Sequence, residues 1–208
     1  MKIISKSSIM LPILIIGVVV AGAYVFYPEV VDDIIPHAES TLQEHCYFSG
    51  GPGTGMSFTE RGQVVKIGCT DAVGSFKLEY IRLQGGYLIS EPSGSLFIRL
   101  YTMDLSSGLP DVLLTETEIQ MDDLDLAYNG NDWVPLFFDE HVELLLDNYY
   151  VISWVYPEYH PGVGIFNCHI TTIGETSSYG CGDAVYRHPG ESWGFLDCDF
   201  VFEVYGYI

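Results

Sequence analysis

One stretch of the sequence concentrates the oxygen-bearing side chains that hard cations prefer. It covers residues 121–132 and reads MDDLDLAYNGND. Calcium takes about six to eight oxygen ligands from carboxylates, amides and carbonyls, which a loop of this composition can supply. The spacing does not follow the EF-hand loop, so a solvated acidic loop between two strands remains the alternative. The candidate calcium ligands are Asp122, Asp123, Asp125, Asn129 and Asp132.

A second group of side chains suits the binding of sugars. Tyr156, Tyr159 and His160 occupy a proline-containing segment, and Trp193 lies in the turn HPGESWG. Flat rings in loops can stack on the apolar face of a pyranose. These four residues are the candidate ligand-binding residues, although a place in the core explains Trp193 equally well.

The cysteines predict a disulfide-bonded protein. In an oxidising compartment an odd number of cysteines indicates disulfides with one thiol left over. Cys168 could pair with Cys181 and Cys46 with Cys69, each closing a local loop. The fifth would then be unpaired, or it would instead join an early cysteine to the last strand. The disulfide candidates are Cys46, Cys69, Cys168, Cys181 and Cys198.

Metal binding by cysteine is the alternative to these disulfides. Cys168, His169, Cys181 and His188 are soft ligands within one region of the sequence. No C-x-x-C pair supports a zinc site, so disulfides remain the preferred interpretation.

No catalytic motif stands in the structural context that it needs. The H-E-x-x-H metalloprotease motif does not occur. GESWG at 190–194 has the letters of the G-x-S-x-G elbow, but the strand-rich pattern does not supply the strand–turn–helix in which an α/β-hydrolase places its serine. Glycoside hydrolysis needs two carboxylates across a cleft. Alternation in the last strand places Glu203 on the outer face with Tyr205, where a sugar groove could form. A glycoside hydrolase-like enzyme is therefore kept as an alternative.

The charge of the chain excludes one class of partner. The formal net charge is −20, with 28 acidic residues against 8 basic ones. Such a surface repels phosphate backbones, so we expect no binding to nucleic acid.

The N-terminus predicts export. Lys2 and Lys6 precede an uncharged run at 9–27 that is long enough to cross a bilayer as one hydrophobic helix. Cleavage near Ala23 would instead release a secreted protein. We therefore expect an anchor or signal segment at 1–27, a linker or stalk at 28–55 and a folded domain at 56–208. Either outcome places the domain outside the cytoplasm.

Short strand-like runs fill the rest of the chain. Period-two alternation sets Phe76, Leu78 and Tyr80 on one face and Lys77, Glu79 and Ile81 on the other, as in half-buried antiparallel strands. Turn clusters separate the runs. The pattern predicts an all-β fold, a single antiparallel β-sandwich of jelly-roll or immunoglobulin-like kind. The runs are 64–69, 76–84, 95–102, 112–119, 133–138, 149–156, 164–170, 184–188 and 199–208.

The order of these strands carries a resemblance. SLFIRLYTMDLSSGLPDVLLTETEI is followed by LLLDNYYVISW and then by AVYRHPGESWGFLDCDFVFEVYGY. Over 76–208 this resembles the β-sandwich domains of exported microbial and phage proteins of unknown or carbohydrate-binding role, which end in G-s-W and D-F-x-F-x-x-Y-G. The cysteine directly before Asp199 departs from that pattern. The resemblance implies a sandwich used for binding or adhesion rather than catalysis.

Together these features predict a non-catalytic extracytoplasmic module that binds a glycan or a cell-surface protein and contacts the membrane through its N-terminal segment. A structural subunit of a surface layer, filament or virion is the main alternative. Calcium is the one cofactor that the sequence suggests.

Overall fold

The computed structural model describes residues 40–46, 53–55, 59–86, 94–124, 132–157, 167–169, 179–196 and 198–208. The predicted N-terminal segment, Asp125, Asn129, Tyr159 and His160 lie outside these ranges. Asp132 and Cys168 lie in described strands, but their side chains do not belong to the described set. The compact unit that contains the strands is Ser40–Ile208.

Seven strands form the first sheet, and every pair in it is antiparallel. The strand β4 lies at its centre, between β13 on one side and β7 and β8 on the other. The strands are β1 (Thr41–Cys46), β2 (Gly53–Gly55), β4 (Phe76–Gly86), β7 (Asp132–Phe137), β8 (Glu143–Leu144), β10 (Asn167–His169) and β13 (Phe202–Tyr207).

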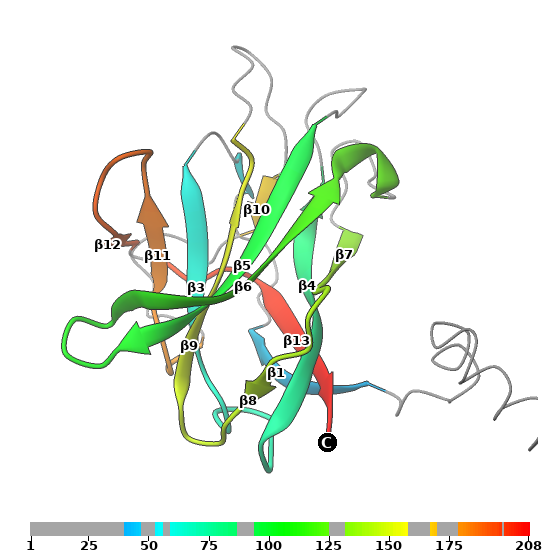
Figure 1. Ribbon diagram of the computed structural model, residues 1–208, viewed down its shortest axis with the longest axis vertical. Coiled ribbons are helices and arrows are strands. Elements are labelled where there is room, and N and C mark those ends of the chain that lie inside the picture. Colours follow the sequence, from blue (N-terminus) through cyan, green and yellow to red (C-terminus); the bar gives the residue numbers. More distant parts are fainter. Residues whose placement is uncertain are drawn as a thin grey trace, which may run out of the picture. The chain divides into compact units, whose positions relative to one another are not determined.

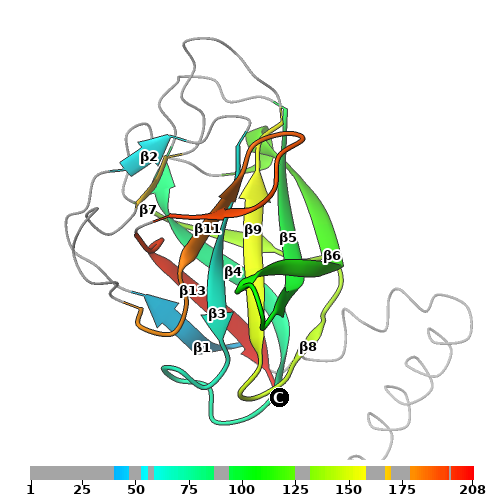
Figure 2. The same cartoon turned by 90° about the vertical axis from the view of Figure 1, so that its left-hand side faces the viewer.

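Six strands form the second sheet, in the order β12-β11-β3-β9-β5-β6, again all antiparallel. The two sheets lie against each other as a β-sandwich, which confirms the predicted all-β class (Figures 1 and 2). The strands are β3 (Glu60–Lys66), β5 (Ser95–Asp104), β6 (Leu109–Gln120), β9 (Tyr149–Val155), β11 (Ala184–Arg187) and β12 (Gly194–Phe195).

The core lies between the inner faces of the two sheets. Alternation along β5 buries Leu96, Ile98 and Leu100 completely, because residues two apart in a strand share one face. Trp154 of β9 and Phe200, which lies just before β13, also meet in this core. Their rings contact edge to face with centroids 4.8 Å apart.

A β-bulge interrupts the predicted alternation of β4. Gly206 of β13 pairs with Leu78 and Tyr205 pairs with Tyr80, so Glu79 is the extra residue. The bulge moves Ile81 into the core, where it is 1% exposed, and turns Tyr80 outward. The prediction that Tyr80 shares a face with Phe76 and Leu78 is therefore wrong.

The first described strand also differs from expectation. Residues 41–46 fall in the range predicted as linker, yet they form β1, which runs beside the C-terminal strand β13 (Figure 1). The sheet therefore begins earlier than residue 56.

One disulfide joins distant parts of the chain. Cys69 follows β3 and Cys181 precedes β11, and the two are bonded across a sequence separation of 112. The predicted local pairings, Cys46 with Cys69 and Cys168 with Cys181, are therefore wrong. The bond also removes Cys181 from the alternative zinc set. A disulfide is consistent with an oxidising compartment.

A buried carboxylate holds the loop that carries Cys69. Glu44 is 0% exposed and accepts hydrogen bonds from the backbone N–H groups of Gly68, Cys69 and Thr70 at 2.5, 3.1 and 2.9 Å. Burial and the Glu44 charge raise the pKa of the neighbouring Tyr179 phenol, which keeps it protonated. Within the described part of the chain, no helix is long and apolar enough to cross a membrane.

Candidate functional site

A row of aromatic rings with one arginine among them lies across the outer face of the seven-stranded sheet. The guanidinium of Arg82 lies 5.3 Å from the Trp133 ring and 5.9 Å from the Tyr205 ring. Tyr205 stacks on Tyr80 with centroids 4.6 Å apart and planes 9° apart. Tyr80 then meets Phe137 at 4.9 Å. We name this row the ring ladder: Trp133, Arg82, Tyr205, Tyr80 and Phe137.

The strand register explains why these side chains meet. Tyr80 lies opposite both Tyr205 of β13 and Phe137 of β7, because β4 is the strand between them. Without the bulge at Glu79, Tyr80 would point into the core and the ladder would lose its middle ring. The sequence-based alternation missed the ladder for this reason.

An ion pair between Arg82 and Glu203 holds the ladder in place. Arg82 contacts the carboxylate of Glu203 at 2.8 Å, and the Tyr205 hydroxyl donates to the same carboxylate at 3.1 Å. Glu203 lies on the outer face with Tyr205, as alternation predicts, but it is only 6% exposed. It therefore supports the ladder rather than standing open to solvent.

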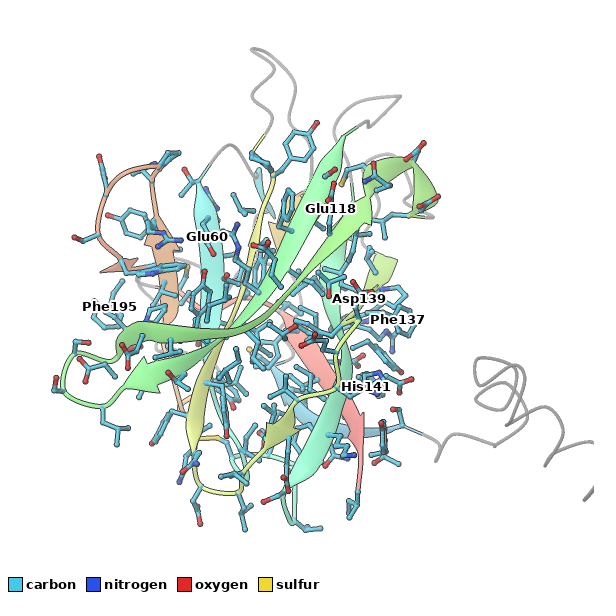
Figure 3. The ribbon with its side chains drawn as sticks, in the orientation of Figure 1. Glu60, Glu118, Phe137, Asp139, His141 and Phe195 are labelled. Atoms are coloured by element: carbon cyan, nitrogen blue, oxygen red, sulfur yellow. A yellow bond between two sulfur atoms is a disulfide. The ribbon has the colours of Figure 1, made fainter. Side chains whose placement is uncertain are left out.

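The ladder ends at a groove between the two sheets. Phe137 is 52% exposed and lines a groove with a cavity volume of about 480 Å³. Figure 3 labels Glu118 from β6, Phe137 from the end of β7 and Asp139 from the segment just after it, and all three line the groove. The Asp139 backbone N–H donates to the Thr117 hydroxyl at 2.9 Å, which ties the two edges of the groove together.

The groove combines the two surfaces that sugars recognise. Its ring offers an apolar plane, and its carboxylate, amide and hydroxyl groups can bond sugar hydroxyls. The polar side chains lining it are Thr117, Glu118, Gln120, Asp123 and Asp139.

The predicted calcium ligands meet this groove in part. Asp122 and Asp123 form the 3₁₀ turn η1 (Met121–Asp123), and Asp123 lines the groove. Among the described residues, no three His, Cys, Asp or Glu side chains gather closely enough to hold a metal ion. Calcium binding by this segment stays a prediction.

The predicted sugar-stacking residues are distributed differently. Tyr156 is 1% exposed, because it continues the inward alternation of Ile152 and Trp154 in β9. Its predicted role as a ligand platform is wrong. Trp193 is half-buried on the other sheet, where its ring lies 4.6 Å from the Arg187 guanidinium and 5.9 Å from the Tyr101 ring.

A second polar cluster occupies the outer face of the six-stranded sheet. Glu60 of β3 is 3% exposed and accepts hydrogen bonds from Ser153 at 2.7 Å and Tyr101 at 3.1 Å. Arg99 and Arg187 also donate to it, at 3.0 and 2.5 Å. We name these five residues the Glu60 cluster.

The strand register brings the residues of the Glu60 cluster together, and Gly62 allows their strands to lie close. Arg187 lies opposite Glu60, and Arg99 lies opposite Ser153. A Cβ at Gly62 would lie 2.9 Å from the Ser153 Cβ, so glycine allows β3 and β9 to approach.

Opposing effects act on the Glu60 carboxyl. Burial would raise its pKa, but the hydrogen bonds from Ser153 and Arg187 and the charge of Arg99 outweigh burial. The pKa of Glu60 consequently lies below its ordinary value, and the carboxyl is ionised at neutral pH.

No protein-family model matches this chain, and no curated protein is significantly similar to it in sequence.

Proposed function

We propose that this chain is a non-catalytic sugar-binding module, a sandwich of the jelly-roll kind that acts outside the cytoplasm, and that the groove ending at Phe137 is its binding site. The observation that carries the proposal is the ring ladder, which presents a half-exposed aromatic ring beside five polar side chains. The disulfide supports an extracytoplasmic setting.

Preorganisation makes this groove suited to binding. Phe137 is held against Tyr80, which is itself stacked on Tyr205, so little side-chain freedom remains to be lost when a ligand arrives. A pyranose would stack on the Phe137 ring while its hydroxyls donate to Glu118 and Asp139. Backbone ordering of Asp139 through Thr117 keeps these acceptors in place.

The buried carboxylates are already paired with protein groups, which supports a binding role rather than hydrolysis. Glu203 is paired with Arg82, and Glu60 accepts four hydrogen bonds. A general acid in a glycosidase needs a raised pKa, whereas the pKa of Glu60 is lowered.

A matched pair of variants tests the proposal. Retention of the full chain on polysaccharide gels identifies the sugar, and titration calorimetry then compares Phe137→Ala with Phe195→Ala. Phe195 is 49% exposed and lies on the opposite side of the view in Figure 3. Loss of a stacking ring costs about 1.5 kcal/mol, so Phe137→Ala should weaken binding about 10-fold. The Phe195→Ala variant should bind as the parent chain does.

Two outcomes would contradict the proposal. The chain could pass unretained through every neutral and acidic polysaccharide, or the two variants could bind a retained sugar equally well. In the second case the sugar binds elsewhere than in the groove.

Self-assembly is the second candidate function, and one observation favours it. The β5–β6 hairpin exposes Leu105, Val112 and Leu113, which are 78%, 54% and 46% exposed. Exposed apolar side chains that gather on one hairpin are typical of contact surfaces between proteins. Sedimentation at rising protein concentration tests it, and a strictly monomeric chain would eliminate it.

A further inference from the structure

Two arginines converge on one carboxylate in a chain that has few cations. The sequence holds 8 basic residues against 28 acidic ones, and both Arg99 and Arg187 donate to Glu60. Arg99 is also paired with Glu116, so the two guanidinium groups face two carboxylates and what remains unused is hydrogen-bond donors rather than charge.

The two arginines differ in how their remaining donors are used. Arg99 also donates through Nε to Glu116 at 2.5 Å, so it bridges two carboxylates. Arg187 bonds Glu60 through Nη2 alone, and the described residues supply no second carboxylate to it. An arginine side chain has five N–H donors, so Arg187 retains donors for a ligand.

Arg187 is also held in a fixed position. Its guanidinium lies 4.6 Å from the centre of the Trp193 ring, while Glu60 anchors one of its nitrogens. The side chain is nevertheless 33% exposed. A guanidinium fixed on one face and along one edge presents its remaining edge in a single orientation.

That exposed part of Arg187 lies at a pocket. The pocket has a cavity volume of about 590 Å³, with Glu60, Arg99 and Arg187 among its lining residues. Val155 and Pro157 line it from the end of β9, and the turn at 188–191 lines it from the far end of β11. Figure 3 shows Glu60 on β3, in the region where these strands are neighbours.

We infer that this pocket binds the carboxylate of a sugar acid, and that this ligand takes the place of the second acid that the described residues do not supply to Arg187. The planar guanidinium can bond both oxygens of a carboxylate, which gives stronger recognition than a single neutral hydroxyl. The carboxylate comes either from a free sugar acid or from a uronic acid within a glycan. The inference uses none of the residues of the groove at Phe137.

Titration of the full chain with glucuronate, glucose and acetate tests the ligand class. Glucuronate should bind with a dissociation constant of about 1 mM at low salt, weaken as salt rises, and exceed glucose at least 10-fold. An oligogalacturonide separates the two sources, because tighter binding per chain end than glucuronate indicates a glycan and equal binding indicates a free acid. Acetate binding as well as glucuronate would show that only the carboxylate is recognised and would overturn the sugar-acid assignment.

Three variants locate the site. Arg187→Gln should weaken glucuronate binding at least 10-fold, because it removes the unshared donors. Lys77→Gln removes the same charge from an exposed position on the other sheet and should leave binding unchanged. Glu191→Gln removes a negative charge from the exposed rim of the pocket and should strengthen binding about 2-fold.

The Glu191→Gln variant keeps the test decisive even if Arg187→Gln folds poorly, since residue 191 is exposed. Equal glucuronate binding by the parent chain, Arg187→Gln and Glu191→Gln would overturn the inference. Phe137→Ala should retain glucuronate binding, so a failure of the groove proposal leaves this result interpretable.

Discussion

The outer faces of the two sheets carry the same trio of side chains and use it differently. On the seven-stranded sheet Glu203 is joined to Arg82 and Tyr205. On the six-stranded sheet Glu60 is joined to Arg99 and Tyr101. Both carboxylates are buried although they lie on outward faces, since the long side chains above them exclude water.

The difference between the faces is the second arginine. Glu203 is paired with Arg82, whose guanidinium is placed between two rings. Glu60 has Arg187 in addition to Arg99. The single pair produces a rigid, electrically neutral support for aromatic rings. The cluster with two arginines is also neutral once Glu116 is counted, but it leaves N–H donors of Arg187 for an incoming anion.

Removing each carboxylate is the strongest way to break this comparison. Glu60→Gln leaves two buried or half-buried guanidinium groups without their shared charge, so we expect unfolding free energy to fall by about 3 kcal/mol. Glu203→Gln affects only one partly exposed arginine and should cost about 1 kcal/mol after allowance for solvent screening. Urea denaturation measures both. Equal losses would mean that the second arginine adds nothing.

Removing an arginine should reverse the order of the two faces. Arg82→Gln takes away the guanidinium that neutralises buried Glu203, with an expected loss of about 2 kcal/mol. Arg187→Gln leaves Glu60 with Arg99, Ser153 and Tyr101, and should cost about 0.5–1 kcal/mol. A larger loss for Arg187→Gln in the same urea experiment would show that Arg187 is structural, not spare.

The smallest expected effect is on the pH dependence of stability, which shows whether Glu60 stabilises the fold through its charge. Its pKa in the folded chain lies below the ordinary value of 4.5. A carboxyl with a lowered pKa stabilises the fold above its unfolded pKa, and that stabilisation is lost as pH falls through the folded value. The stability gap between the parent chain and Glu60→Gln should therefore hold from pH 7 to about pH 5 and close below pH 4.5.

Thermal melts across that pH range measure the gap. A gap of constant size down to pH 3 would mean that the shape and hydrogen bonds of Glu60 matter and its charge does not.

Local sequence patterns predict most of the strands of this fold. Alternation and turn residues place β4, β5, β6, β7, β9, β11 and β13 within a few residues of their observed bounds. These signals depend on neighbouring residues, which the sequence displays directly. The strand β1 escapes prediction because it is short and most of its residues are polar.

The candidate sites depend on pairing between strands that are far apart in the sequence, which local patterns do not reveal. Tyr80 reaches the ladder only because of a bulge whose partner strand begins over a hundred residues later. Glu60, Arg99 and Arg187 meet because β3 lies between β9 and β11, an order that the residues themselves do not state. The Cys69–Cys181 bond is equally long in range. Tyr156 is different, since the inward alternation of Ile152 and Trp154 already indicated its burial.

The same disulfide affects what a single proteolytic cleavage does to the chain. The covalent ring that it closes contains every strand from β4 to β10, and with them Phe137 and Arg99. A protease that cleaves once anywhere within that ring opens a loop but releases no fragment. Both faces of the sandwich would then keep their strands in one molecule until a reductant separates the pieces.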